Sequence, residues 1–125
     1  MSNWSQIGSD LNGEGSAYSE GYVIDLSDDS SVVAIGDRTR SHVKIYQNVS
    51  GSWTQIGSDI DGEDKGDQSG YSVSLSGDGS TVAIGAPNNN GQGGVDSDGY
   101  AFRSGHTRIY RNFSGAWVQV GSDID

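Results

Sequence analysis

A repeated motif constrains the fold of this chain more than any other feature of its sequence. The pattern Trp-x-Gln-Ile/Val-Gly-Ser-Asp-Leu/Ile occurs three times, beginning at Trp4, Trp53 and Trp117. The stretches between these copies also match each other: residues 21–27, 33–36 and 42–46 recur as 70–76, 82–85 and 106–110. Such self-similarity indicates repeated supersecondary units, each of which packs against its neighbours.

The spacing of the copies locates an insertion and divides the chain. Trp53 follows Trp4 by 49 residues, whereas Trp117 follows Trp53 by 64, so the second unit is longer by 15 residues. The additional residues fall within 86–104, a Gly- and Asn-rich stretch typical of a surface loop. We therefore divide the chain into an extra Trp strand with its loop (1–20), a first unit (21–69) and a second unit with the insertion (70–125).

Each unit contains four segments with the two-residue period of β-strands. In residues 22–26 and again in 71–75, large apolar side chains alternate with smaller or polar ones. The sequence Asn-x-Ser-Gly at 48–51 and 112–115 predicts a tight hairpin turn before each later Trp strand, although it also matches the glycosylation pattern. Four antiparallel strands repeated at this interval predict an all-β fold: two four-stranded antiparallel propeller blades plus one extra strand at Trp4.

The second unit also resembles a known family. Residues 70–87, with an aromatic-rich strand, an Asp/Gly turn and a Gly-Ala-Pro ending, resemble the FG-GAP or integrin-α-like β-propeller repeat, and His106 to Tyr110 resembles the strand that follows. The first unit is a weaker copy, with Gly36-Asp37-Arg38 in place of Gly-Ala-Pro. The resemblance implies a propeller that serves adhesion, ligand recognition or scaffolding in an extracellular or cell-surface protein.

Composition excludes several classes of partner. Asp and Glu number 17 against 7 Lys and Arg, which gives a net charge of −10, and no basic stripe offsets it. Phosphate backbones and anionic lipid headgroups would be repelled, so we expect neither nucleic acid nor membrane as a partner. The chain contains no Cys and its first residues lack the pattern of a signal peptide, so we expect any export signal of the parent protein to lie outside this chain.

Calcium is the first candidate ligand. The turns 27–30 and 76–79 depart from the family's Asp-rich metal loop and offer too few oxygen ligands for Ca²⁺. A denser set of carboxylates, Asp59, Asp61 and Asp64, could surround a hard cation and is our candidate metal site.

A second acidic cluster lies at Asp96 and Asp98 in the insertion. The alternative for both clusters is a solvated acidic turn. This alternative is favoured because residues 10–14, the counterpart of 59–63 in the repeat, carry fewer charges.

The three tryptophans are the second candidate site. Trp4, Trp53 and Trp117 could stack on sugar rings of a glycan ligand, but repetition at one structural position favours packing between units.

An enzymatic function is not expected. His42 and His106 occupy matching strand positions, and neither lies near a Ser or Cys motif of a nucleophilic site. We therefore expect a non-enzymatic protein without a required cofactor.

The number of blades leads to an expectation about assembly. Propellers close with about four to eight blades, so two blades would leave apolar faces in water. We expect a cyclic homo-oligomer, a trimer ahead of a tetramer, in which the strand at Trp4 completes a neighbour's blade by exchange. The alternative is an extracellular ligand-binding or adhesive module, lectin-like or calcium-dependent, with a glycan or protein ligand.

Overall fold

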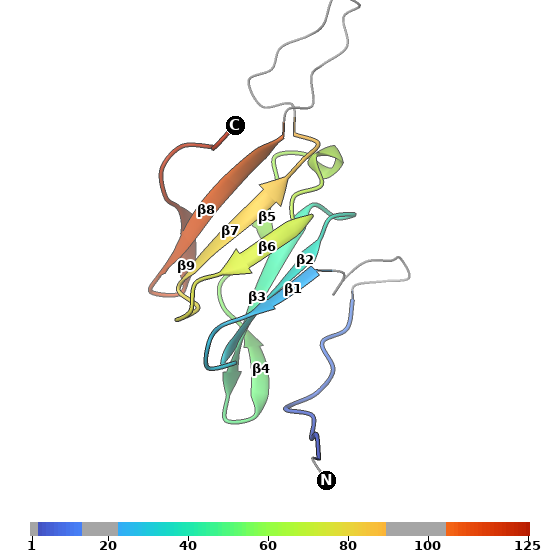
Figure 1. Ribbon diagram of the computed structural model, residues 1–125, viewed down its shortest axis with the longest axis vertical. Coiled ribbons are helices and arrows are strands. Elements are labelled where there is room, and N and C mark those ends of the chain that lie inside the picture. The colour runs from blue at the N-terminus through green and yellow to red at the C-terminus, as the bar shows by residue number, and fades with distance from the viewer. Residues whose placement is uncertain (1–2, 14–22, 90–104) are drawn as a thin grey trace, which may run out of the picture.

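The computed structural model describes residues 3–13, 23–89 and 105–125, and the regular structure of these residues is almost entirely β-strand. Residues 23–89 and 105–125 form two antiparallel sheets (Figure 1). The first sheet has the order β1 (Val23–Leu26), β2 (Val32–Asp37), β3 (His42–Val49), β4 (Ser52–Gln55), and the short β5 (Ile60–Asp61) also pairs with β3. The second sheet has the order β6 (Ser72–Leu75), β7 (Thr81–Ala86), β8 (His106–Phe113), β9 (Ala116–Gln119). The all-β class and the two four-stranded antiparallel sheets are confirmed.

The two sheets are equivalent residue by residue. Val33 pairs with Tyr46 in the first sheet, and the repeat partners Val82 and Tyr110 pair in the second. The last hairpin of each sheet, β3–β4 or β8–β9, likewise aligns an Asn with the repeated Trp. Each residue of β1 to β4 therefore has a repeat partner at the same position of the second sheet.

The predicted Asn-x-Ser-Gly turns are confirmed. Ser50 and Gly51 both have positive φ angles, of 51° and 90°, as a two-residue type I′ hairpin requires. The Asn48 side chain accepts a hydrogen bond from the Gly51 amide at 2.9 Å, and Asn112 does the same for Gly115 at 2.7 Å. The local turn chemistry thus sets the register of each hairpin.

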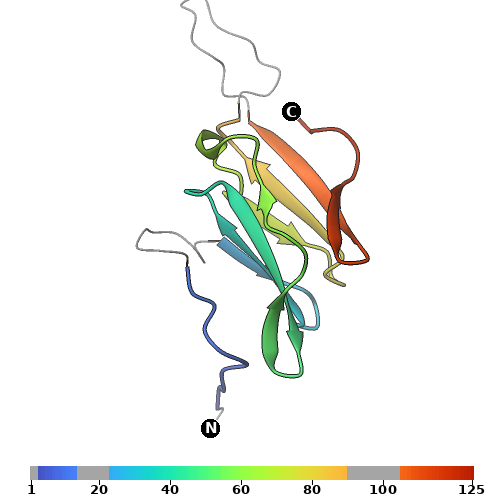
Figure 2. The same ribbon diagram turned by 180° about the vertical axis from the view of Figure 1, so that it is seen from behind.

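One face of each sheet packs against the other sheet. Figures 1 and 2 show the second sheet lying beside the first, with residues 3–13 on the opposite side of the first sheet. The buried cluster between the sheets consists of the apolar residues Val32, Ala34, Val43, Ile45, Ile60, Val82 and Ile84. These residues form the hydrophobic core of the described chain.

Glycines allow the two sheets to approach closely. A Cβ atom on Gly36 would collide with the backbone carbonyl of Gly70, which itself has a φ of +91°. Two further hydrogen bonds join the sheets: the Asp28 amide donates to the Gly77 carbonyl at 2.8 Å, and the Leu75 amide donates to the Asp25 carboxylate at 2.6 Å. Contacts that involve the backbone therefore help to set the spacing between the sheets.

The predicted strand at Trp4 is not present. Residues 3–13 have no strand pairing, and β5 is the additional strand of the described residues. The physical reason is the lack of a partner: the equivalent residues around Trp53 form a strand because β3 lies beside them, whereas no described strand lies beside Trp4 in that way.

Helical structure in the described residues is limited to the 3₁₀ turn η1 (Lys65–Asp67). Asp64 caps this turn: its carboxylate accepts from the Gly66 amide at 3.2 Å, and Asp67 accepts from the Asp64 amide at 3.1 Å. Among all the described residues, no helix is long and apolar enough to cross a membrane.

Matched glycine substitutions test the closeness of the sheets. Gly36→Ala should lower the free energy of unfolding by about 1–3 kcal/mol, because the new methyl group meets backbone that cannot rotate away. The repeat partner Gly85 faces the Ser72 side chain, which can change rotamer, so Gly85→Ala should cost less. Urea denaturation of both variants measures the difference, and equal costs would contradict this account.

Candidate interaction surfaces

The repeated tryptophans connect each unit to the preceding one. The Trp117 indole Nε1 donates a hydrogen bond to the carbonyl of Ile56 at 2.9 Å. One repeat earlier, Trp53 Nε1 donates to the carbonyl of Ile7 at 2.8 Å. Trp53 and Trp117 thus contact the preceding segment, whereas Trp4 is 95% exposed.

A glycine in the left-handed region receives each of these indoles. Gly8 and Gly57 have φ angles of +73° and +69°, and a Cβ atom there would lie 2.8 Å and 3.1 Å from Cδ1 of Trp53 and Trp117, respectively. The third copy, Gly121, has the same conformation with a φ of +77°, but no atom lies within 4 Å of its Cβ position. The chain therefore carries two filled tryptophan sockets and one open socket at Val120 and Gly121.

The second sheet has an open outer face. Ile45 and Ile60 of the first sheet are 1% and 6% exposed because the second sheet covers them. Their repeat partners are Ile109, which is partly exposed, and Ile124, which is 56% exposed. We call Ile109, Val120 and Ile124 the outer face of the second sheet.

The first sheet has a matching open face on its other side. Val73 and Leu75 are half-buried against the first sheet, whereas their repeat partners Ile24 and Leu26 are 60% and 49% exposed. We call Ile24 and Leu26 the outer face of the first sheet. Single exposed apolar side chains are ordinary, but these positions are covered wherever the repeat supplies a neighbouring sheet.

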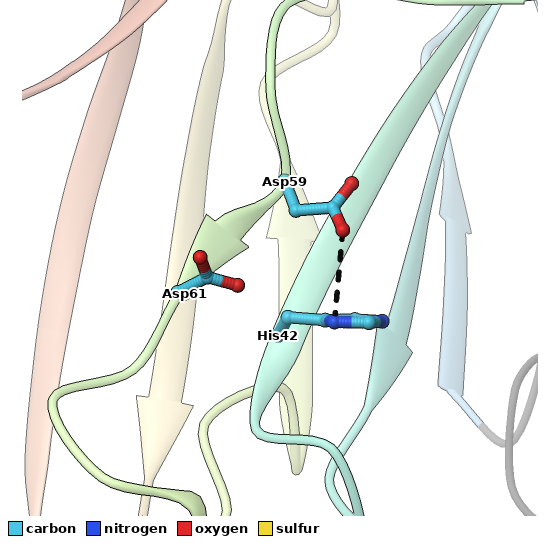
Figure 3. Close-up of side chains that lie close together, drawn as sticks. All are labelled: His42, Asp59 and Asp61. Atoms are coloured by element: carbon cyan, nitrogen blue, oxygen red, sulfur yellow. Dashed lines mark ion pairs between the residues drawn. The ribbon is translucent and has the colours of Figure 1, made fainter.

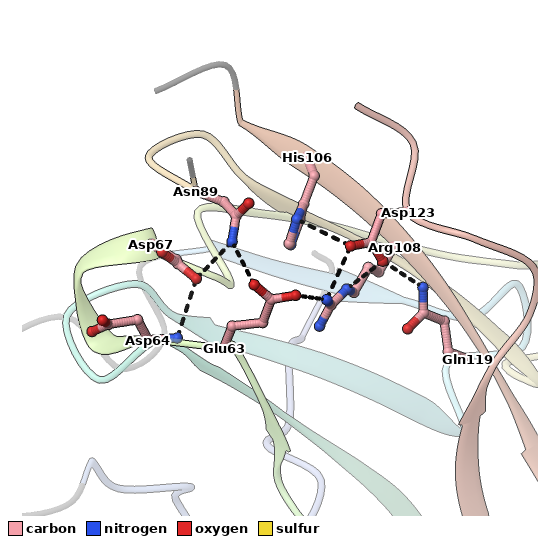
Figure 4. A network of polar contacts seen from close by, with 8 residues as sticks. All are labelled: Glu63, Asp64, Asp67, Asn89, His106, Arg108, Gln119 and Asp123. Atoms are coloured by element: carbon pink, nitrogen blue, oxygen red, sulfur yellow. Dashed lines mark hydrogen bonds and ion pairs between the residues drawn. The ribbon is translucent and has the colours of Figure 1, made fainter. Parts of the chain in front are cut away.

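A polar network joins the loop after β5 to the second sheet (Figure 4). Arg108 binds Asp123 through Nε at 2.7 Å and through a second nitrogen at 3.0 Å, and that second nitrogen also binds Glu63. Asn89 donates to Asp67 at 2.8 Å and to Glu63 at 3.2 Å. The Glu63 carboxylate of the first unit is thereby paired with the Arg108 cation of the second.

Arg108 controls the ionisation of its partner. Its hydrogen bonds hold the pKa of Asp123 at about 2, below the usual 3.8, and the amide of Gln119 adds to the effect. The Asp123 hydrogen bonds in turn raise the pKa of Arg108. Both groups stay charged over the physiological range, and the cation occupies the space between Glu63 and Asp123.

A related cluster lies in the first sheet at His42, Asp59 and Asp61 (Figure 3). The imidazole Nδ1 of buried His42 lies 3.8 Å from the Asp59 carboxylate, which also accepts a hydrogen bond from Gln55 at 2.6 Å. One nitrogen and two carboxylates converge here, a donor set that could hold a divalent cation.

The structure separates the three aspartates of the predicted calcium site. It brings Asp59 and Asp61 together with His42, but the Asp64 carboxylate caps η1. The second predicted cluster, Asp96 and Asp98, lies outside the described residues. In the turns that we had excluded, Asp29 and Asp78 each bond to two serine side chains and one amide, which holds their pKa values low.

The two histidines are buried at matching positions of β3 and β8. His42 Nε2 and His106 Nδ1 have no hydrogen-bond partner, and His106 Nδ1 lies 3.6 Å from the Asp123 carboxylate. The nearby Ser41 hydroxyl is used structurally, because it donates to the Asp64 carbonyl and accepts from the Ser69 amide. Neither of those nitrogens accepts a proton from a serine.

Two features of this surface are not apparent from the sequence. The sockets at Gly8, Gly57 and Gly121 were part of the repeat, but a repeated glycine does not reveal which side chain approaches it. The network around Arg108 was also missed, although Gln and Asp four residues apart recur in all three Trp motifs and bond in each, at 2.7, 2.6 and 2.8 Å.

The Arg108–Asp123 pair should make stability depend on pH. A carboxylate with a lowered folded-state pKa contributes fully above its unfolded pKa of 3.8, and the contribution is lost as pH falls towards about 2. Asp123→Asn should therefore lose less unfolding free energy than the wild type between about pH 4 and pH 2. Urea denaturation across this range measures the difference, and the exposed Asp125→Asn serves as the control. Parallel pH profiles of Asp123→Asn and the wild type would contradict the assignment.

The calcium hypothesis for Asp59, Asp61 and Asp64 makes a separate prediction. Calcium that binds only the folded state should raise the unfolding midpoint, by about 2.7 kcal/mol of stability at a hundredfold excess over its dissociation constant. A variant with all three residues replaced by Asn should show no such rise. An unchanged midpoint of the wild type in millimolar calcium would rule the site out.

The comparisons with known proteins leave the family open. No model of a known family and no curated protein matches the chain. A 6-phosphogluconolactonase-like protein from Bacteroides uniformis has a similar solved structure, with 16% sequence identity and a TM-score of 0.38. The match covers 81% of this chain and 39% of that one, so the chain spans well under half of its neighbour.

Proposed function

We propose that this chain is a non-enzymatic β-propeller module that associates head to tail with further copies of itself. In this proposal the two sheets are blades of the FG-GAP type, in a protein of the extracellular space or cell surface. The observation that carries it is the difference between matched positions: Ile45 and Ile60 are buried by a neighbouring sheet, whereas Ile109 and Ile124 are not.

The two outer faces support a head-to-tail arrangement. The outer face of the second sheet repeats the surface of the first sheet that contacts its neighbour, and the outer face of the first sheet repeats the surface of the second. Two copies can therefore reproduce between chains the contact that exists within one. Burial of apolar surface favours such a contact, and the loss of translational and rotational freedom on association opposes it.

The geometry of propellers limits the size of the assembly. A contact between unlike faces is heterologous, and it closes into a ring when the rotation between copies divides a full turn. Propellers contain about four to eight blades, so three chains would supply six and four chains would supply eight. We expect the trimer ahead of the tetramer.

Solution mass tests this proposal. Light scattering coupled to size exclusion should give three or four times the chain mass of 13.1 kDa. Leu26→Glu should convert the assembly to monomers, because it places a charge on the outer face of the first sheet. Val49→Glu changes an equally exposed residue in the hairpin between β3 and β4 and should leave the mass unchanged. A well-folded wild-type monomer at micromolar concentration would refute the ring.

A further inference from the structure

Residues 4–11, the N-terminal segment, occupy a specific place on the first sheet. On the second sheet the same place is taken by residues 53–60, which present the Ile56 carbonyl and Gly57 to Trp117. The N-terminal segment presents the Ile7 carbonyl and Gly8 to Trp53 in the same way. Its residues 9–11 also line a hollow with Trp53, as residues 57–60 do with Trp117.

We propose that the segment 117–124 of a second copy replaces the N-terminal segment at this place, so that residues 4–11 act as a displaceable cap on the assembly interface. The inference rests on the proposed self-association. It names the residues that form the contact between copies and the segment that blocks this contact. Its basis is that the two segments are copies of one motif: Trp4-Ser-Gln-Ile-Gly-Ser-Asp-Leu11 and Trp117-Val-Gln-Val-Gly-Ser-Asp-Ile124.

The cap is held weakly. The bond from Trp53 to the Ile7 carbonyl is the one hydrogen bond between residues 3–13 and the remaining described residues. Residues 3–10 are exposed, and Leu11 is half-buried. The cap also leaves Ile24 and Leu26 largely in water. A competitor that covers these side chains has more apolar surface to bury at the same place.

The segment 117–124 arrives as part of a rigid unit. Trp117 pairs with Asn112 in the β8–β9 ladder, the Val120 amide donates to the Ile109 carbonyl at 2.7 Å, and Ile124 exchanges two hydrogen bonds of 2.9 Å with Thr107. Docking would place Gly121 against the partner's Trp53, whose indole would donate to the Val120 carbonyl. The open socket would be filled, and the two outer faces would meet.

The same contacts argue against strand exchange. If residues 4–11 of one copy joined the β8 edge of another, they would have to displace β9 together with the bonds of Val120 and Ile124. Releasing the cap breaks one hydrogen bond between the segment and the rest of the described chain. Displacement of the cap is therefore the less costly route to the interface.

Two equivalent glycines allow a matched test in the full chain. Asn tolerates the left-handed conformation of both positions, so the added side chain is the main change. Gly8→Asn should push the cap away from Trp53 and tighten self-association about fivefold, the equivalent of one net hydrogen bond. Gly121→Asn meets open space within its own chain but would collide with the partner's Trp53, so it should weaken association about tenfold or more. The double variant should associate as weakly as Gly121→Asn alone.

Sedimentation velocity over a concentration series gives the association constants, and a cooperative thermal transition shows that each variant is folded. Leu11 lies in the N-terminal segment and not in a sheet, so Leu11→Asp should weaken the cap without disturbing either sheet. This variant is used in the experiment if Gly8→Asn does not fold. A wild type that associates, together with a Gly8→Asn variant that associates more tightly, would support the cap. If the wild type is oligomeric and Gly121→Asn does not change its association constant, the inference is overturned but the proposed function is not. The same conclusion follows if Gly8→Asn associates more weakly than the wild type. Monomers in the wild type and in both cap variants at every concentration would overturn both.

Discussion

The structure depends on one constraint: each sheet carries apolar side chains on both of its faces. In an antiparallel sheet with one solvated face, polar residues alternate with apolar ones, so only one face needs cover. Here β2 presents Val32 and Ala34 on one face and Val33 and Ile35 on the other, and all four are buried. Such a sheet needs cover on both faces. In the described residues another sheet covers one face of each, and the N-terminal segment meets the other face of the first sheet beside Val33. The outer faces, the tryptophan sockets and the cap all follow from that.

The backbone, and not side-chain packing alone, sets how neighbouring sheets meet. Gly36 and Gly70 bring main chain against main chain, and the indole of Trp117 reaches a carbonyl of the preceding unit. Contacts of this kind fix distance and direction together, because a hydrogen bond weakens steeply when its angle changes. A neighbour that satisfies the same donors and acceptors must therefore arrive in nearly the same orientation. In the proposed assembly, a surface made from repeats would for this reason favour another repeat as its partner.

The strands and turns are predictable because their sequence signals are local. The contacts between units are not predictable in this way. The alternation in 71–75 and the Asn-x-Ser-Gly turn at 112–115 act over a few residues, so the sequence alone places them. The strand at Trp4 does not form within the single chain, because its motif is that of Trp53 while a strand needs a partner that the motif does not contain. The cluster of His42, Asp59 and Asp61 joins residues that two strands bring together, whereas proximity in sequence had suggested Asp64. Whether calcium binds there stays a prediction.

The two polar clusters show how repeated positions can diverge without loss of the fold. Lys44 and Arg108 are repeat partners, as are His42 and His106, and Asp59 and Asp123. Only a guanidinium offers several donors in a fixed plane, and Arg108 uses them to bind Asp123 in two places and Glu63 of the preceding unit. A lysine in that position could not hold both carboxylates with the same geometry. Arg108 thus links the two sheets at the point where the acidic loop after β5 crosses between them.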